Sequence, residues 1–323
     1  MIGKFSNPSV RPYVLLAVIA VILALIDGDN GRFLNHATMF SVLQFFATIG
    51  PIALGLGLTM IIGEFDISVG GMLSLAGCLA VMTGVEHPVI GVVIAVLAGL
   101  MAGLGQGAIM VWLGLSSVGV TLGGLLTLSG LTYVLTDNQT IGYGRMDVAM
   151  LVNAPLAEIF SLRNLVALAV VAIAAVFMAW TRIGRDVVAT GSDRRAALVA
   201  GLNVNRIIVG VFALSGLLTA LSGALLSYSL AAASPVALAD TLVPAVAAAI
   251  IGGVSLSGGK GTPLGIAGGV LVLGVLRSGL TAIGVPPYVH DIVTGCVLLT
   301  VALLDAPDLE RRLFWVKQRL RRT

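Results

Sequence analysis

The sequence predicts an all-α polytopic membrane protein with about ten transmembrane helices. Of its 323 residues, 58% are hydrophobic and only 10% are charged, and the mean hydropathy is +1.07. A typical soluble domain is roughly 25% charged. No soluble core could bury this much apolar surface, so lipid is the expected solvent. The 41 glycines are typical of membrane helices whose backbones pack closely.

Ten apolar stretches are separated by polar breaks, and each is near the ~20 residues that a bilayer requires, although some are shorter. Lys4 and Arg11 precede the first stretch and no small-residue cleavage site follows it, so we expect a retained helix with its basic end in the cytoplasm. An even number of spans then places both termini in the cytoplasm, within a single transmembrane domain over residues 1–323. The predicted spans are residues 12–26, 38–62, 70–84, 88–113, 117–136, 162–180, 207–231, 242–253, 263–284 and 288–304.

The basic residues agree with this topology. Fourteen of the 18 Lys and Arg residues lie on the predicted cytoplasmic side, including those of a basic tail at 307–323. Only Arg32, Arg145 and Arg163 lie outside, and Arg277 falls within a span. This is the asymmetry of the positive-inside rule. Topology therefore explains the pI of about 9.1, which indicates no nucleic-acid partner.

The fourth span carries a stripe of small side chains. They recur every four residues and so share one helix face. The stripe consists of Ala95, Gly99, Gly103 and Gly107. We expect this face to pack closely against another helix.

A polar, glycine-rich break with two acids, Glu64 and Asp66, separates the second and third spans. Backbone of this kind persists at membrane depth only when it is buried in protein or lines water. In one interpretation Asp66 or Ser68 caps the helix over 70–84 by accepting its free amide hydrogens. In the other, the acids belong to a proton or substrate pathway. Glu64 is less easily explained, because the break lies toward the cytoplasm, where this side chain could simply be solvated.

The same break has a counterpart later in the chain. "IIGEFDISVG" (61–70) aligns without gaps to "IIGGVSLSGG" (250–259), with five of ten positions identical. Both segments end a span that runs inward, so the two halves are predicted to be parallel repeats.

Enzymatic chemistry is not indicated. "SGGKGT" (257–262) resembles a phosphate-binding loop, but Gly261 follows the Lys where Ser or Thr is required, and Val254 replaces the first Gly. The three histidines have no metal-ligand spacing. We therefore predict no catalytic residue, no metal site and no cofactor bound by this chain.

The segment 181–206, "TRIGRDVVATGSDRRAALVAGLNVNR", is the longest predicted cytoplasmic loop and contains five arginines. Ser192 is a possible N-cap, Asp193 suits the positive first turn, and Gly201 can end the helix in a left-handed conformation. One face of this short helix carries Ala196, Val199 and Ala200. Such a helix fits a groove in another protein, although an ordinary amphipathic surface loop has the same pattern.

This loop resembles the coupling segment of permease subunits of ribose-type ABC importers. Asp193 stands where that family usually has Asn. The matching residues are Gly184, Ala189, Gly191, Ala196, Ala197, Gly201 and Leu202.

Both breaks resemble signatures of the same family. In "GEFDISVGG", Asp66, Ser68 and Gly70 match, and Glu64 replaces a usual Gly. "IIGGVSLSGGKGTPLG" is similar to the second signature and carries Ser255, Ser257 and Gly258. The resemblance extends over about residues 38–305.

The resemblance implies a type II permease fold like that of the vitamin-B12 importers, in the bacterial inner membrane. It implies a second permease subunit (identical or related), a cytoplasmic ABC ATPase that binds ATP and Mg, and a periplasmic solute-binding protein. The helix over 193–201 would couple to the ATPase, and the two breaks would shape the pathway or its gate. The implied solute is a pentose, hexose, polyol or autoinducer-like furanose.

Two departures weaken a strict ribose assignment. The family's E-L-D-A run is "TLVPA" (241–245), and Arg277 stands where paired Asn is common. Arg277 either lines the pathway or extends outward to the membrane surface. The alternative function is a self-sufficient proton-coupled secondary transporter that uses Glu64 and Asp66.

Overall fold

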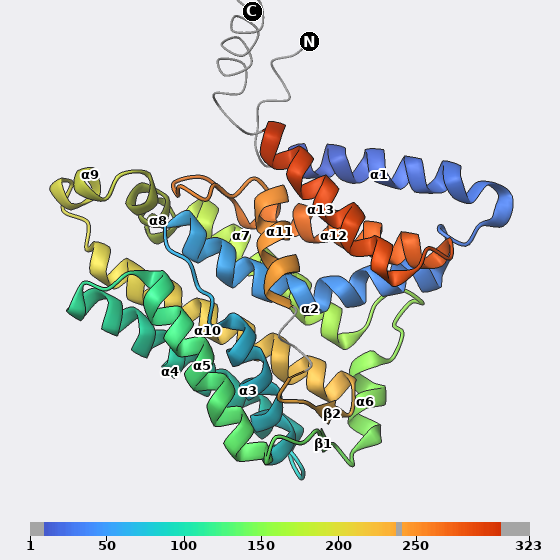
Figure 1. Ribbon diagram of the computed structural model, residues 1–323, viewed down its shortest axis with the longest axis horizontal. Coiled ribbons are helices and arrows are strands. Elements are labelled where there is room, and N and C mark those ends of the chain that lie inside the picture. Colours follow the sequence, from blue (N-terminus) through green and yellow to red (C-terminus); the bar gives the residue numbers. More distant parts are fainter. Residues whose placement is uncertain (1–9, 237–240, 305–323) are drawn as a thin grey trace, which may run out of the picture.

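The computed structural model describes residues 10–236 and 241–304, which form a mostly helical protein (Figure 1). Each of the ten predicted apolar stretches corresponds to a helix. These helices are α1 (Arg11–Asp27), α2 (His36–Ile61), α3 (Val69–Thr83), α4 (Pro88–Leu113), α5 (Ser117–Thr136), α7 (Leu162–Trp180), α10 (Val204–Ser229), α11 (Leu242–Ile251), α12 (Pro263–Ala282) and α13 (Pro287–Leu304). The sequence did not predict η2 (Gly28–Asn30), α6 (Met146–Asn153), α8 (Arg182–Ser192), or the two-residue strands β1 (Ile141–Gly142) and β2 (Ala232–Ala233).

Six of these helices are long and apolar enough to cross a membrane, namely α2, α4, α5, α7, α10 and α12. Helices α3, α11 and α13 are shorter apolar helices. The chain is therefore an all-α polytopic membrane protein, while a total of ten spans and two cytoplasmic termini stay predictions. The basic tail at 307–323 lies outside the described residues.

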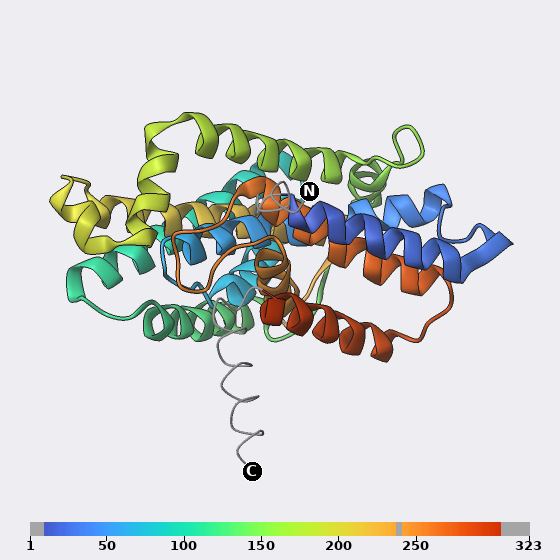
Figure 2. The ribbon, with the colours of Figure 1, turned by 90° about the horizontal axis from the view of Figure 1, so that it is seen from above.

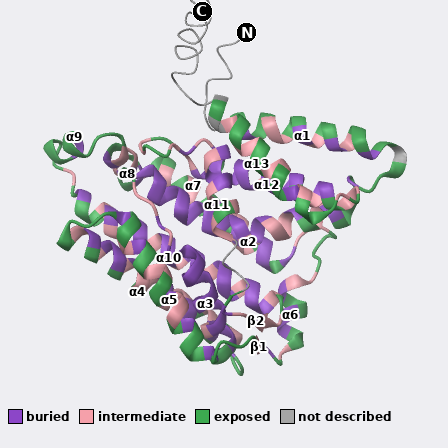
Figure 3. Ribbon diagram, in the orientation of Figure 1, coloured by how far each residue is buried: buried purple, intermediate pink, exposed green. Residues whose placement is uncertain are grey.

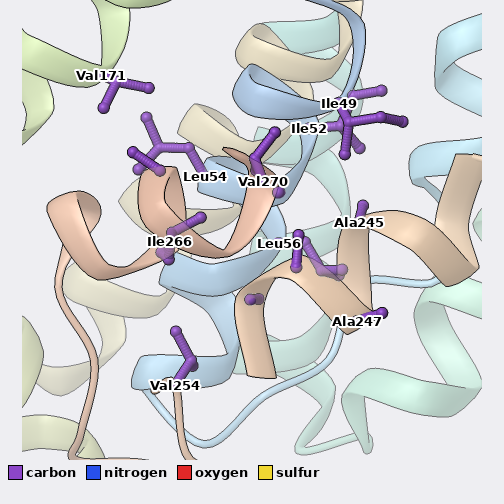
Figure 4. Close-up of a cluster of buried hydrophobic side chains, with 14 of the residues drawn as sticks. Ile49, Ile52, Leu54, Leu56, Val171, Ala245, Ala247, Val254, Ile266 and Val270 are labelled. Atoms are coloured by element: carbon purple, nitrogen blue, oxygen red, sulfur yellow. The ribbon is translucent and has the colours of Figure 1, made fainter. Parts of the chain in front are cut away.

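The core lies between α2, α10 and α12, whose residues are mostly buried (Figure 3). Ile52, Leu54 and Leu56 of α2 have no exposed surface, and they belong to one buried cluster with Ile266 and Val270 of α12 (Figure 4). Helices α4, α5 and α7 are as apolar, but most of their residues are exposed or only half-buried. Exposed apolar helices are expected where lipid surrounds a protein.

The predicted small-residue stripe of α4 packs against α10. A Cβ atom built on Gly103 would lie 2.8 Å from the carbonyl carbon of Phe212, and one on Gly107 would lie 2.8 Å from Cα of Val209. Only glycine permits this approach of two helix backbones. The prediction of a close helix contact is confirmed, and its partner is α10.

The short elements lie at opposite ends of the bundle. Helices α8 and α9 (Arg194–Val199) lie at one end, and α6, β1 and β2 lie at the other (Figure 1). The two strands pair antiparallel, with Ile141 opposite Ala233. Figure 2 shows α7 and α13 on opposite sides of the central helices. The end that carries α8 and α9 also contains the two breaks, residues 62–68 between α2 and α3 and residues 252–262 between α11 and α12. We call these the glycine-serine breaks.

Candidate functional site

Helix α2 ends in a Schellman motif that begins the first break. The Gly63 amide donates to the Met60 carbonyl oxygen and the Glu64 amide to that of Thr59, each at 2.9 Å. Gly63 has φ +77°, a left-handed conformation that glycine adopts without a Cβ penalty. The chain therefore leaves the helix sharply, and the next side chain, Glu64, projects from the turn.

Helix α11 ends in the same way at the second break. The Gly253 amide donates to Ile250 O at 2.9 Å, and the Val254 amide donates to Ala249 O at 3.0 Å. Gly253 has φ +84° and is the structural equivalent of Gly63. The gap-free sequence alignment paired Gly63 with Gly252, so that alignment is wrong by one residue. What the two segments share is the geometry with which a helix ends. The correct alignment pairs the two glycines in the left-handed conformation, Gly63 and Gly253.

The end of α8 lies between these two breaks. The Gly259 amide donates to the Ile61 carbonyl oxygen at 2.8 Å, which joins the second break to the end of α2. A Cβ atom on Gly191 would overlap the same oxygen, and one on Gly258 would lie 2.7 Å from Gly191 O and 3.0 Å from Gly63 N. We call this meeting of residues 61–64, 191–194 and 255–261 the junction.

An ion pair between Glu64 and Arg194 closes one side of the junction. The Glu64 side chain is 12% exposed and that of Arg194 is 44% exposed. Glu64 is therefore neither freely solvated nor isolated. Arg194 was not predicted as its partner, because one arginine among five in the loop carries no distinguishing pattern.

Asp66 is buried beneath the junction, with 2% of its surface exposed. Its Oδ1 accepts from the Ser68 amide at 3.0 Å and from the Ser68 hydroxyl at 2.6 Å, and its Oδ2 accepts from the Ser215 hydroxyl at 2.8 Å. Burial raises the pKa of the Asp66 carboxyl, and the hydrogen bonds from Ser68 and Ser215 oppose that rise.

The predicted helix cap at α3 is wrong. Ser68 occupies the N-cap position without a side-chain hydrogen bond to the helix, and Asp66 bonds Ser68 itself. Asp66 therefore stabilises the connection between α2 and α3, and the hydrogen bond from Ser215 links this connection to α10. A serine inside the apolar span over 207–231 was the only signal for this partner.

The second break is a compact turn that its own backbone and hydroxyls stabilise. The Ser255 amide donates to Lys260 O at 3.1 Å, and the hydroxyls of Ser255 and Ser257 lie 2.8 Å apart. Gly258 and Gly259 both have positive φ, at +83° and +73°. The turn thus places the Gly259 amide against α2.

The predicted coupling loop contains two helices where one was expected. Asp193 is the N-cap of α9, and its Oδ1 accepts from the amides of Arg195 at 2.9 Å and Ala196 at 3.1 Å. The predicted cap, Ser192, is instead the last residue of α8, and its hydroxyl donates to Val188 O. The prediction for Ser192 is wrong because Ser192 still belongs to α8, whereas Asp193 has the extended backbone of an N-cap and presents its carboxylate to the free amides.

Glycines shape both ends of this segment. Gly184 is buried at the corner between α7 and α8, where a Cβ atom would lie 2.6 Å from Cα of Met178. Gly201 has φ +82°, and its amide donates to Leu198 O, so it ends α9 as predicted. Ala189 is exposed on α8, and its carbonyl oxygen accepts from the Asp193 amide at 3.2 Å.

The outward face of α9 is apolar. Val199 is 90% exposed and Leu198 is 58% exposed, and Ala196 is exposed beside them. Ala197, by contrast, is 4% exposed and packs against the core. The segment thus presents an apolar tip at the end of the bundle, which fits a groove in another protein.

The two remaining predicted site residues, Gly70 and Arg277, also lie outside the junction. Gly70 is buried at the start of α3. Arg277 is exposed on α12, about 20 Å along the helix from Pro263. No ion pair involves Arg277 within residues 10–236 and 241–304.

Comparisons with known proteins agree over nearly the whole chain. Residues 38–302 match the family model described as branched-chain amino acid transport system / permease component. The chain is 32% identical over 304 residues to the ribose import permease protein RbsC of Bacillus subtilis, covering 91% of each chain. It is 28% identical over 372 residues to the xylose transport system permease protein XylH of Haemophilus influenzae, covering 95% of this chain and 99% of that one. It is 29% identical over 302 residues to the D-allose transport system permease protein AlsC of Escherichia coli, covering 91% and 90%. No solved structure matches the chain.

Proposed function

This chain belongs to the branched-chain amino acid transport system / permease component family, and from that premise we propose that it is the membrane-spanning permease subunit of an ATP-binding-cassette importer. The observation that carries the proposal is the family match over residues 38–302. The relatives named above are permeases for ribose, xylose and D-allose, so the proposed solute is a sugar or a sugar-like molecule. Pentoses, hexoses, polyols and autoinducer-like furanoses belong to this class.

The proposed partner at the α8–α9 end is a cytoplasmic ABC ATPase. A chain that only forms a pathway needs a separate source of energy, and ATP and Mg would bind that partner. The apolar tip formed by Ala196, Leu198 and Val199 would enter a groove of the ATPase. Gly184, Gly191, Asp193 and Gly201 would position the tip by fixing the corners and the cap of the two helices.

The remaining partners follow from the same proposal. A second permease subunit, identical or related, would complete the pathway, and a periplasmic binding protein would deliver the solute to the α6 end. The chain would lie in the inner membrane of a bacterium, in the type II permease fold, with the α8–α9 end in the cytoplasm. The two glycine-serine breaks would form part of the inner gate.

Alternating access would then work through the junction. ATP binding closes an ATPase dimer, which would displace α8 and α9 and so reorient the pathway. The exposed position of Arg277 on α12 leaves it free to face a second subunit, the solute or the membrane surface. Both acids of the first break have partners, Glu64 in an ion pair and Asp66 in three hydrogen bonds. This engagement favours a structural role for them over a proton relay.

The deciding experiment is purification of the chain from its native membrane in mild detergent, followed by identification of the proteins that accompany it. The expected result is a stoichiometric ATPase that is lost when Val199 is changed to Asp. Uptake of D-ribose, D-xylose or D-allose by vesicles that contain this chain alone, without ATP, would contradict the proposal. Abolition of that uptake in Glu64→Gln and Asp66→Asn would then identify a proton-coupled transporter.

A further inference from the structure

We propose that the Glu64–Arg194 ion pair is a tether that makes the two glycine-serine breaks follow the movement of α9. The inference rests on the proposed function, because it assigns the route by which movement imposed on α9 by the ATPase would reach the pathway. Glu64 and Arg194 are positioning residues in this scheme, since neither needs to touch the solute.

The pair joins two rigid points. Glu64 directly follows the Schellman turn of α2, whose backbone is fixed by two hydrogen bonds. Arg194 is the first residue of α9, and the Asp193 side chain fixes that end of the helix. The Glu64 carboxylate is 12% exposed, so water screens the pair less than it screens a pair on the open surface. Among the described residues, neither side chain has another ion-pair partner.

Close packing between α8 and the two breaks transmits movement in one direction only. The end of α8 is wedged between both breaks, since a Cβ atom on Gly259 would lie 2.6 Å from Oγ of Ser192 and 2.7 Å from its Cα. Contacts of this kind resist compression, so an inward movement of α8 pushes both turns. They offer little resistance when the surfaces separate.

The Glu64–Arg194 ion pair transmits movement in the opposite direction. An attraction between opposite charges resists separation, so an outward movement of α9 pulls the 62–64 turn with it. The Gly259–Ile61 hydrogen bond then carries the same displacement to the second break. A transport cycle needs movement in both directions, and in this scheme the return movement depends on Glu64 and Arg194.

The test uses the complex of this chain with its ATPase and binding protein, reconstituted in liposomes. The measured quantity is the amount of radiolabelled sugar taken up per ATP hydrolysed, with whichever of D-ribose, D-xylose or D-allose the parent complex imports. The variants are Glu64→Gln, Arg194→Gln, the double neutral variant, and the charge exchange Glu64→Arg with Arg194→Glu. Arg206→Gln is the matched control, because this exposed arginine lies at the same end and has no ion pair among the described residues.

Each single neutral variant should lower uptake per ATP by about five-fold, a typical size for coupling between two sites. The double neutral variant should lower it no further, because either change already removes the pair. The charge exchange should restore most of the ratio, and Arg206→Gln should leave it unchanged.

Three results would overturn the tether. They are an unchanged ratio in both single variants, a double variant whose loss is the product of the single losses, and a fall that coincides with loss of ATPase binding. Binding of the ATPase and the melting temperature of each variant are therefore measured in parallel. A parent chain that binds no ATPase refutes the proposed function itself, and that failure is visible before any variant is made.

Discussion

Gly191 lies directly against the carbonyl oxygen of Ile61, the last residue of α2. A Cβ atom at Gly191 would overlap that oxygen and would lie 2.8 Å from the Gly259 amide nitrogen. The absence of a side chain at this one position therefore allows the end of α8 to lie between the two breaks. The junction exists because three segments that are distant in sequence meet around a glycine.

Replacing Gly191 with Ala should destabilise the protein by about 1–3 kcal/mol, as inserted methyl groups do in packed sites. Alanine favours a helix over glycine by about 1 kcal/mol, so the loss would measure the contact rather than the helix. Gly210→Ala is the control, because a Cβ atom there meets nothing within 4 Å. Melting in detergent compares the two variants, and equal melting temperatures would refute the close contact.

Gly103 is the second position where a backbone contact is testable. Gly103→Val should lower stability by about 1–3 kcal/mol, because the added methyl groups would separate α4 from α10. Gly105→Val is the matched control, since it lies on the same helix with open space around its Cβ position. A fall in melting temperature that is equal for both variants would show that helix propensity, and not the α4–α10 contact, is responsible.

The sequence predicted the apolar helices well because lipid imposes a simple rule on length and composition. Each stretch ended where polar or glycine residues interrupt the apolar run, and α4, α5 and α7 have the predicted bounds.

Helix α8 was missed for a physical reason. Its residues include Gly184, Gly191 and the β-branched Val187, Val188 and Thr190, all of which disfavour an isolated helix. The packing of both glycines against backbone stabilises it in the folded protein.

The site was predicted as separate motifs but not as one place. The glycine-serine breaks and the 181–206 loop were each identified, and Gly201 ends α9 as expected. Their meeting depends on tertiary contacts, such as Gly259 with Ile61, for which a single sequence carries no signal. The same limit explains why Ser215 and Arg194 were not recognised as the partners of Asp66 and Glu64.

Val199 should be central to binding of the ATPase. Its side chain is 90% exposed at the tip of α9, and a charge placed there would enter an apolar groove without a partner. Val199→Asp should weaken binding of the ATPase at least about 30-fold, the effect of losing an interface hot spot, while the melting temperature of the isolated chain stays unchanged. Leu115→Asp, an exposed position on the α4–α5 turn at the same end, is the control. Equal loss in both variants would place the binding surface elsewhere.

Asp66 should make stability depend on pH in a direction that its burial determines. Because burial raises its pKa above the value of about 3.9 in an unfolded chain, the folded state holds this proton more tightly. The contribution of this proton to the free energy of unfolding is then fully present below about pH 4, and it is lost as the pH rises through the folded-state pKa.

Asp66→Asn should remove that loss, because an amide stays neutral and can still bond Ser68 and Ser215. Melting temperatures of parent and variant, measured from pH 4 upward, should therefore diverge, with the parent falling relative to the variant. Asp147→Asn is a control of opposite sign, since the Arg145 guanidinium holds the pKa of that exposed carboxyl below its ordinary value. For Asp147 any stabilisation is present at neutral pH and is lost as the pH falls. If the parent instead gains stability over Asp66→Asn as the pH rises, the hydrogen bonds from Ser68 and Ser215 outweigh burial and Asp66 is held as a carboxylate.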